Sequence, residues 1–107
     1  MIWDGAVVAA GILDKAATLE GAAATDREKE HRYCFNPIGK KVIELGCGCA
    51  ALPGMVAIAL GAEHVVLTDY EIIVESDALS ANLERNLCDM EERRKVSKMV
   101  YCWGKDK

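Results

Sequence analysis

Two hydrophobic periods alternate along this chain and predict an alternation of helices and strands. From Ile2 to Leu19, apolar residues recur at every third or fourth position, which is typical of a helix that packs one face against other elements. Short runs rich in Val and Ile, each ended by a glycine or an acid, predict buried strands. The predicted elements, in order, are a helix over Ile2–Leu19, a strand over Lys41–Gly46, a helix from Pro53 to Leu60, a strand over His64–Asp69, a helix from Ile72 to Asn86 and a strand over Val96–Trp103.

This order of elements predicts the fold class. Strand, helix, strand, helix and strand with short links form the first half of a doubly wound parallel sheet, which is built by right-handed crossovers. We therefore expect an α/β, Rossmann-like fold whose first βαβαβ half, with three parallel strands, follows an N-terminal helix. Residues 21–38 show neither period and are expected to form a loop insertion. With strand order 3-2-1, Val42–Leu45 is expected at an unpaired sheet edge.

Composition and charge exclude several classes of protein. The chain has 107 residues, 51% of them hydrophobic, which suffices for one domain but not for a two-domain enzyme. With 13 Lys and Arg against 17 Asp and Glu, the net charge is −4, and no segment supplies the basic patch of a nucleic-acid binder. No apolar run reaches the roughly 18 residues that span a bilayer, and no basic segment opens a secretory signal. We expect no nucleic-acid partner and no membrane association.

The cysteines indicate the cellular compartment. There are 5 of them, irregularly spaced and without a C-x-x-C pair, which favours reduced thiols in an intracellular protein. Cys47 and Cys49 form the one close pair; without a second pair or a nearby histidine, two small loop residues are a better interpretation than a zinc site. No metal is therefore expected, and the expected location is the cytoplasm, with the nucleus as an alternative.

The loop after the first predicted strand is the first candidate for chemistry. In an open parallel sheet, ligands bind beyond the carboxyl ends of the strands. Gly46 and Gly48 lie directly after the strand and permit a tight turn and the close approach of a ligand to the backbone, which a Cβ would block. A turn that serves geometry alone is the alternative.

Two acids sharpen this interpretation. Asp69 ends the second strand 23 positions after Gly46, where a carboxylate can accept hydrogen bonds from both hydroxyls of a ribose; a helix N-cap is the alternative. Glu44 lies inside an apolar strand, where a carboxylate without a partner is costly. It would repel the pyrophosphate of a dinucleotide but attract the ammonium of S-adenosylmethionine, so the spacing favours the latter cofactor. The structural alternative is an ion pair of Glu44 with Lys40 or Lys41.

Five separated motifs occur in an order that resembles a known family. They are Trp3-Asp4 at the start of the first helix, Gly39 to Gly48, Gly61-Ala62 before Val65 to Asp69, Asn82 with Asn86, and Trp103-Gly104. Together they resemble the seven-β-strand S-adenosylmethionine-dependent protein-lysine methyltransferases, the methyltransferase-like group that includes the calmodulin-lysine and chaperone-lysine enzymes. The resemblance covers nearly the whole chain except residues 21–38.

The resemblance implies a role for each matching residue. Glycine-loop residues Gly46, Cys47 and Gly48 would bind the amino-acid part of the cofactor and Asp69 its ribose, while Trp3 and Trp103 would flank the pocket. The implied substrate is a protein, methylated on a lysine side chain. The family's acid-x-x-aromatic motif follows a fourth strand that is not seen here, so we expect a truncated, cofactor-binding N-terminal part of the enzyme and predict no catalytic residue.

Other interpretations stay open. The chain could be a non-catalytic Rossmann-like fragment that folds only with a partner supplying further strands, or a fragment of a nicotinamide-dependent oxidoreductase. Asn82 and Asn86, at i and i+4 on one helical face, are expected to satisfy backbone or neighbouring polar groups rather than a ligand.

Overall fold

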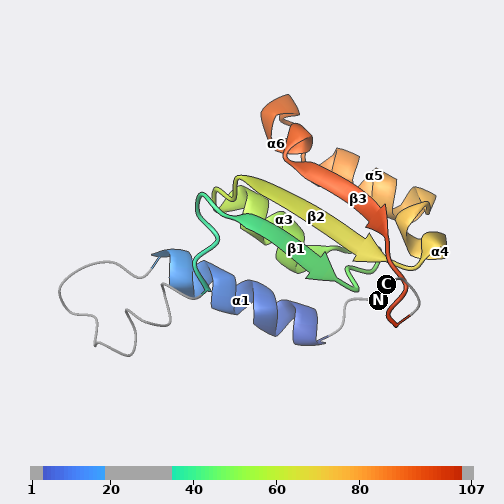
Figure 1. Ribbon diagram of the computed structural model, residues 1–107. Helices are drawn as coiled ribbons and strands as arrows, with labels where there is room; N and C mark the ends of the chain where they lie inside the picture. The colour runs from blue at the N-terminus through green and yellow to red at the C-terminus, as the bar shows by residue number, and fades with distance from the viewer. Residues whose placement is uncertain (1–3, 19–34, 105–107) are drawn as a thin grey trace.

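The computed structural model describes residues 4–18 and 35–104 and has the predicted alternation of strands and helices (Figure 1). Its elements are α1 (Asp4–Thr18), β1 (Lys41–Leu45), α3 (Leu52–Ala59), β2 (His64–Asp69), α4 (Glu71–Val74), α5 (Asp77–Asn86), α6 (Met90–Arg94) and β3 (Val96–Val100).

The strands form one parallel sheet in the order β1-β2-β3, so the prediction that β1 lies at an edge of these three strands is confirmed. In the register, Leu45 lies opposite Thr68, and Asp69 lies opposite Val100. The carboxyl ends of the three strands therefore lie together at one end of the sheet, and the loops that follow β1 and β2 lie side by side there.

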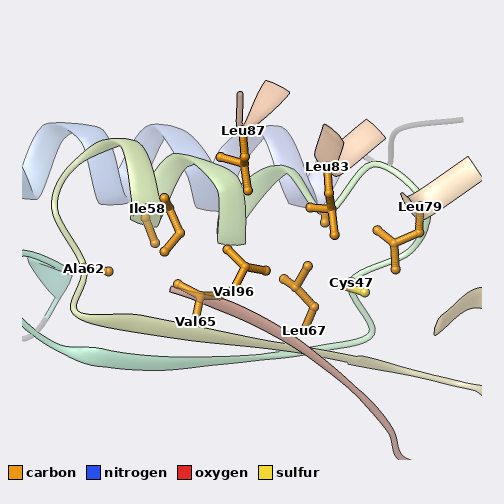
Figure 2. Packing of buried hydrophobic residues seen from close by; sticks show 11 residues of the cluster. Cys47, Ile58, Ala62, Val65, Leu67, Leu79, Leu83, Leu87 and Val96 are labelled. Atoms are coloured by element: carbon orange, nitrogen blue, oxygen red, sulfur yellow. The ribbon is translucent and has the colours of Figure 1, made fainter. Parts of the chain in front are cut away.

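The core lies between one face of the sheet and the helices α3 and α5. Figure 2 shows Leu67 of β2 beside Leu79 and Leu83 of α5, and Val65 of β2 beside Ile58 of α3. Val65, Leu67, Leu79 and Leu83 are at most 1% exposed. Each such side chain contributes about 1.5–3 kcal/mol when it is fully buried. The regularly spaced apolar residues of α3 and α5 thus hold both helices against this face of the sheet.

Helix α1 packs against α3, as the apolar spacing of Ile2–Leu19 predicts. Small residues make this close approach possible: Ala10 and Ala16 are buried, and Leu13 packs against the core cluster. Of the helices described, none is both long enough and apolar enough to cross a membrane.

The opposite face of the sheet is open to solvent in the described part of the chain. Ile43 and Leu45 of β1 are 57% and 56% exposed there, with Lys41 on the same face. The prediction of a buried first strand is therefore wrong, because an apolar run alone does not reveal that only one face of the strand has helices packed against it.

The structure also corrects the helices and strand that follow β2. The single helix predicted over Ile72–Asn86 is divided into α4 and α5, because the Ser76 hydroxyl caps a new helix by accepting a hydrogen bond from the Leu79 amide at 3.2 Å. Helix α6 was not predicted; Asp89 caps it through the Glu91 amide at 2.8 Å. Strand β3 ends at Val100 rather than at Trp103.

Candidate functional site

The loop between β1 and α3 turns back over the carboxyl end of β2. The backbone amides of Gly46 and Cys47 both donate hydrogen bonds to the Thr68 carbonyl, each at 2.9 Å. Gly46 and Gly48 have positive φ angles of 75° and 63°, in the region that favours glycine. The tight turn expected from the two glycines is therefore present at the predicted place.

Asp69 holds this loop in position from the end of β2. Its Oδ2 accepts a hydrogen bond from the Gly48 amide at 2.9 Å, and its Oδ1 accepts one from the Tyr70 amide at 2.7 Å. The N-cap residue of α4 is Tyr70, so Asp69 is not the helix cap that was the alternative interpretation. A carboxylate offers about four lone-pair sites, so hydrogen-bonding capacity is left for a ligand in the cleft.

Glu44 lies on the helix-covered face of β1, opposite to Lys41. Its Oε1 accepts a hydrogen bond from the Gly54 amide at 2.8 Å. Burial raises the pKa of Glu44 to about 7; the Gly54 hydrogen bond opposes this rise, and the negative charge of Asp69 adds to it. An ion pair with Lys41 does not form, because alternation along the strand directs the two side chains to opposite faces.

Cys47 has a buried side chain between these two acids. Figure 2 shows it pointing into the core beside Leu79. The pKa of the Cys47 thiol is raised to about 12, chiefly by burial and also by the negative charges of the nearby Glu44 and Asp69 carboxylates. The thiol is therefore inert, and only the backbone of Cys47 is suited to meet a ligand.

These residues surround a cleft of about 760 Å³ at the carboxyl end of the sheet. Glu44, Gly48 and Asp69 line it, together with apolar side chains from α1 and the start of α3. Among the described residues that line the cleft there is no Lys, Arg or His. Its charged groups are thus both carboxylates, which disfavours an anionic ligand and favours a cationic one.

Aromatic side chains form a smaller hollow next to this cleft. It has a volume of about 130 Å³ and is lined by Tyr70, Tyr101 and Trp103, together with Gly46 and Asp69. Trp103 is 62% exposed, so it is not a core residue. A Cβ placed on Gly46 would lie 3.7 Å from Cζ2 of the Trp103 ring. An exposed aromatic face is therefore available beside the glycine turn and the Asp69 carboxylate.

The structure brings six of the seven predicted site residues to this end of the sheet. They are Glu44, Gly46, Cys47, Gly48, Asp69 and Trp103. The seventh, Trp3, lies outside the described residues. The prediction for Asn82 is confirmed: its Nδ2 donates to the carbonyls of Cys49 and Ala50, at 3.1 and 2.7 Å.

Three residues of the site were missed by the sequence analysis. Tyr70 and Tyr101 line the aromatic hollow, and each directly follows a strand, which is the signal that could have identified them. Gly54 was missed as the partner of Glu44. A glycine weakens a helix, so its presence in the first turn of an apolar helix is a signal that another element packs closely there.

Comparison with known proteins identifies the family. A family model described as "Lysine methyltransferase" matches residues 1–107. The chain belongs to the lysine methyltransferase family. The family match confirms the resemblance that the separated sequence motifs indicated.

Individual relatives of the chain are similar to it over different lengths. It is 46% identical over 66 residues to the protein N-terminal and lysine N-methyltransferase efm7 of Schizosaccharomyces pombe, a match that covers 61% of this chain and 24% of that protein. A solved structure from Pyrococcus horikoshii, described as a "putative RNA methyltransferase", has a TM-score of 0.47 and 18% identity, covering 94% of this chain and 50% of that one. The match thus spans about a quarter of the curated relative's length.

The described residues contain no group of three or more His, Cys, Asp or Glu side chains arranged to hold a metal ion.

Proposed function

We propose that this chain is the cofactor-binding part of an S-adenosylmethionine-dependent protein-lysine methyltransferase. The observation that carries the proposal is the charge of the cleft: two carboxylates and a glycine turn meet at the carboxyl ends of the strands, and no described cationic side chain lines the site. A nicotinamide dinucleotide would place its pyrophosphate at the glycine turn beside Glu44, which like charge disfavours.

The residues of the site fit S-adenosylmethionine part by part. We assign Asp69 to the ribose hydroxyls, because its carboxylate lies at the end of β2 with acceptor capacity left. The second oxygen of Glu44 has no hydrogen-bond partner among the described residues and can accept from the ammonium. Gly46 and Gly48, with the backbone of Cys47, leave room for the amino-acid chain.

The aromatic residues are assigned to the other end of the cofactor. Trp103, with its exposed face beside Gly46, is proposed to flank the adenine or the sulfonium. Trp3 is proposed for the opposite side on the family resemblance alone. When bound, S-adenosylmethionine supplies an electrophilic methyl group on a cationic sulfur.

The proposed substrate is a protein amine, the ε-amino group of a lysine. The family supports this choice, and the Schizosaccharomyces pombe relative is named for N-terminal and lysine methylation. The chain's own groups hold and orient the methyl donor, so their contribution to the rate is proximity and alignment. Location in the cytoplasm, with the nucleus as an alternative, stays a prediction.

Calorimetric titration with S-adenosylhomocysteine tests the proposal. We expect saturable binding by the wild-type chain, at least a tenfold loss in Asp69→Ala, and unchanged affinity in Asp77→Ala, which removes an equal charge from an exposed site on α5. Binding of NAD without binding of S-adenosylhomocysteine would instead support the oxidoreductase interpretation and refute ours.

A further inference from the structure

Glu44 makes a contact that does not depend on any cofactor. Its Oε1 accepts the Gly54 amide at 2.8 Å, and Gly54 lies in the first turn of α3. Backbone amides in a first turn have no partner within the helix. The N-cap residue of α3, Ala51, provides no side-chain hydrogen bond. Glu44 of β1 therefore supplies the acceptor that a capping side chain usually supplies.

The packing at this contact is close enough to fix the position of α3. A Cβ on Gly54 would lie 2.5 Å from Cδ2 of Leu67 and 2.8 Å from Oε1 of Glu44. Carbon atoms in contact are normally about 3.5–4.0 Å apart, so any larger residue at position 54 would force Leu67 or Glu44 to move. The first turn of α3 is thus held against the sheet by a hydrogen bond and by direct packing.

The loop of residues 46–51 is held at several points, including the hydrogen bonds from Asn82 to the carbonyls of Cys49 and Ala50. Asp69 holds its middle through the Gly48 amide, and Glu44 holds the helix that follows it. Ala51 has a φ of 46°, a left-handed conformation that costs a non-glycine residue about 1–2 kcal/mol. A strained loop keeps its conformation only when the surrounding contacts hold it.

We infer that Glu44 is a positioning residue: by holding the first turn of α3 against β1, its carboxylate fixes the loop of residues 46–51 in the conformation that receives the cofactor. The inference deepens the proposed function and rests on it. It assigns Glu44 an effect on the whole cofactor, including the adenosine part that Glu44 does not touch.

Two ligands and two variants separate this role from direct contact. S-adenosylhomocysteine carries the amino-acid part, and 5′-methylthioadenosine lacks it. Glu44→Ala removes the acceptor for the Gly54 amide, whereas Glu44→Gln keeps an oxygen in its place. We expect Glu44→Ala to weaken the binding of both ligands by about tenfold or more, because a lost charge-assisted hydrogen bond has effects of that order. Glu44→Gln should bind 5′-methylthioadenosine as the wild type does.

Hydrogen exchange of the Gly54 amide gives a readout that needs no ligand. Exchange should accelerate in Glu44→Ala and stay near the wild-type rate in Glu44→Gln. Should Glu44→Ala fail to fold, Glu44→Asp replaces it with the same expectations, since its carboxylate is one methylene shorter and falls short of Gly54.

Three outcomes would overturn the inference. If Glu44→Ala bound 5′-methylthioadenosine as tightly as the wild type does, Glu44 would act only by direct contact with the amino-acid part of the cofactor. If Glu44→Ala had a lower unfolding midpoint but unchanged affinity for both ligands, Glu44 would contribute to folding alone. Wild-type protein that binds neither ligand would refute the proposed function as well, so the two failures are distinguished by the wild-type titration.

Discussion

Replacement of Gly54 by alanine tests the close contact between α3 and the sheet. The new Cβ would lie 2.5 Å from Cδ2 of Leu67 and 3.3 Å from Cγ1 of Val65. To restore an ordinary carbon–carbon contact of about 3.5 Å, the Leu67 methyl must move by roughly 1 Å. Leu67 is 1% exposed and Val65 is fully buried, so the surrounding core has to move with it.

The expected cost follows from opposing contributions. Overpacking a tight core costs about 1–3 kcal/mol, and alanine in place of glycine in a helix returns up to about 1 kcal/mol. We therefore expect Gly54→Ala to lower the free energy of unfolding by about 1–2 kcal/mol. Gly11→Ala in α1 is the matched control, because a Cβ there meets nothing within 4 Å. That variant should be stabilised by about 0.5–1 kcal/mol.

Urea unfolding followed by circular dichroism measures both variants against the wild type. We predict changes of opposite sign, with a separation of about 1.5–3 kcal/mol between the two variants. If Gly54→Ala were as stable as Gly11→Ala, the contact between α3 and β2 would be looser than described, and the positioning role of Glu44 would lose its geometric basis.

Three further predictions concern charge, thiols and the α5 contact. The pKa of Glu44 is raised from 4.5 to about 7, so between these pH values the folded state binds more protons than the unfolded state. The free energy of unfolding should therefore fall as the pH rises through this range in the wild type, and fall less in Glu44→Gln. Urea midpoints at pH 5 and pH 8 measure this, and an equal fall in both proteins would contradict it. Iodoacetamide labelling with mass mapping should modify exposed Cys88 at pH 8 and spare Cys47, whose pKa is raised to about 12; labelling of both at similar rates would contradict its burial. Asn82→Ala, which removes two hydrogen bonds to the loop, should cost about 1–2 kcal/mol of stability and weaken S-adenosylhomocysteine binding. Glu84→Ala, at an exposed position of the same helix, should do neither; calorimetry and urea unfolding measure both variants.

The strands and the place of the site could be predicted from the sequence. Strands of five or six residues rich in Val and Ile, separated by segments with helical spacing, are typical of a parallel sheet whose strands all end on the same side. Once the strands are parallel, residues that directly follow them must converge. Gly46, Gly48 and Asp69 were predicted on that basis and lie together.

The partners within the site could not be predicted in the same way. Glu44 was expected to need a cation, and a backbone amide ten positions away, at Gly54, now supplies its hydrogen bond. That contact depends on how closely α3 approaches the sheet, which is set by the packing of Leu67 rather than by any local pattern. The break between α4 and α5 was missed for a related reason: the Ser76 side chain competes with the helix backbone, and apolar spacing does not record that competition.

We propose that the cleft at the carboxyl end of the sheet binds S-adenosylmethionine. Titration of the ¹⁵N-labelled chain with S-adenosylhomocysteine tests it most directly, because glycine amides report from both ends of the sheet. We predict saturable shifts of the Gly46, Gly48 and Gly54 amides, with Gly39 and Gly61, which are paired at the opposite end, unchanged. Shifts at Gly39 and Gly61, or no shift in a folded chain, would contradict the claim.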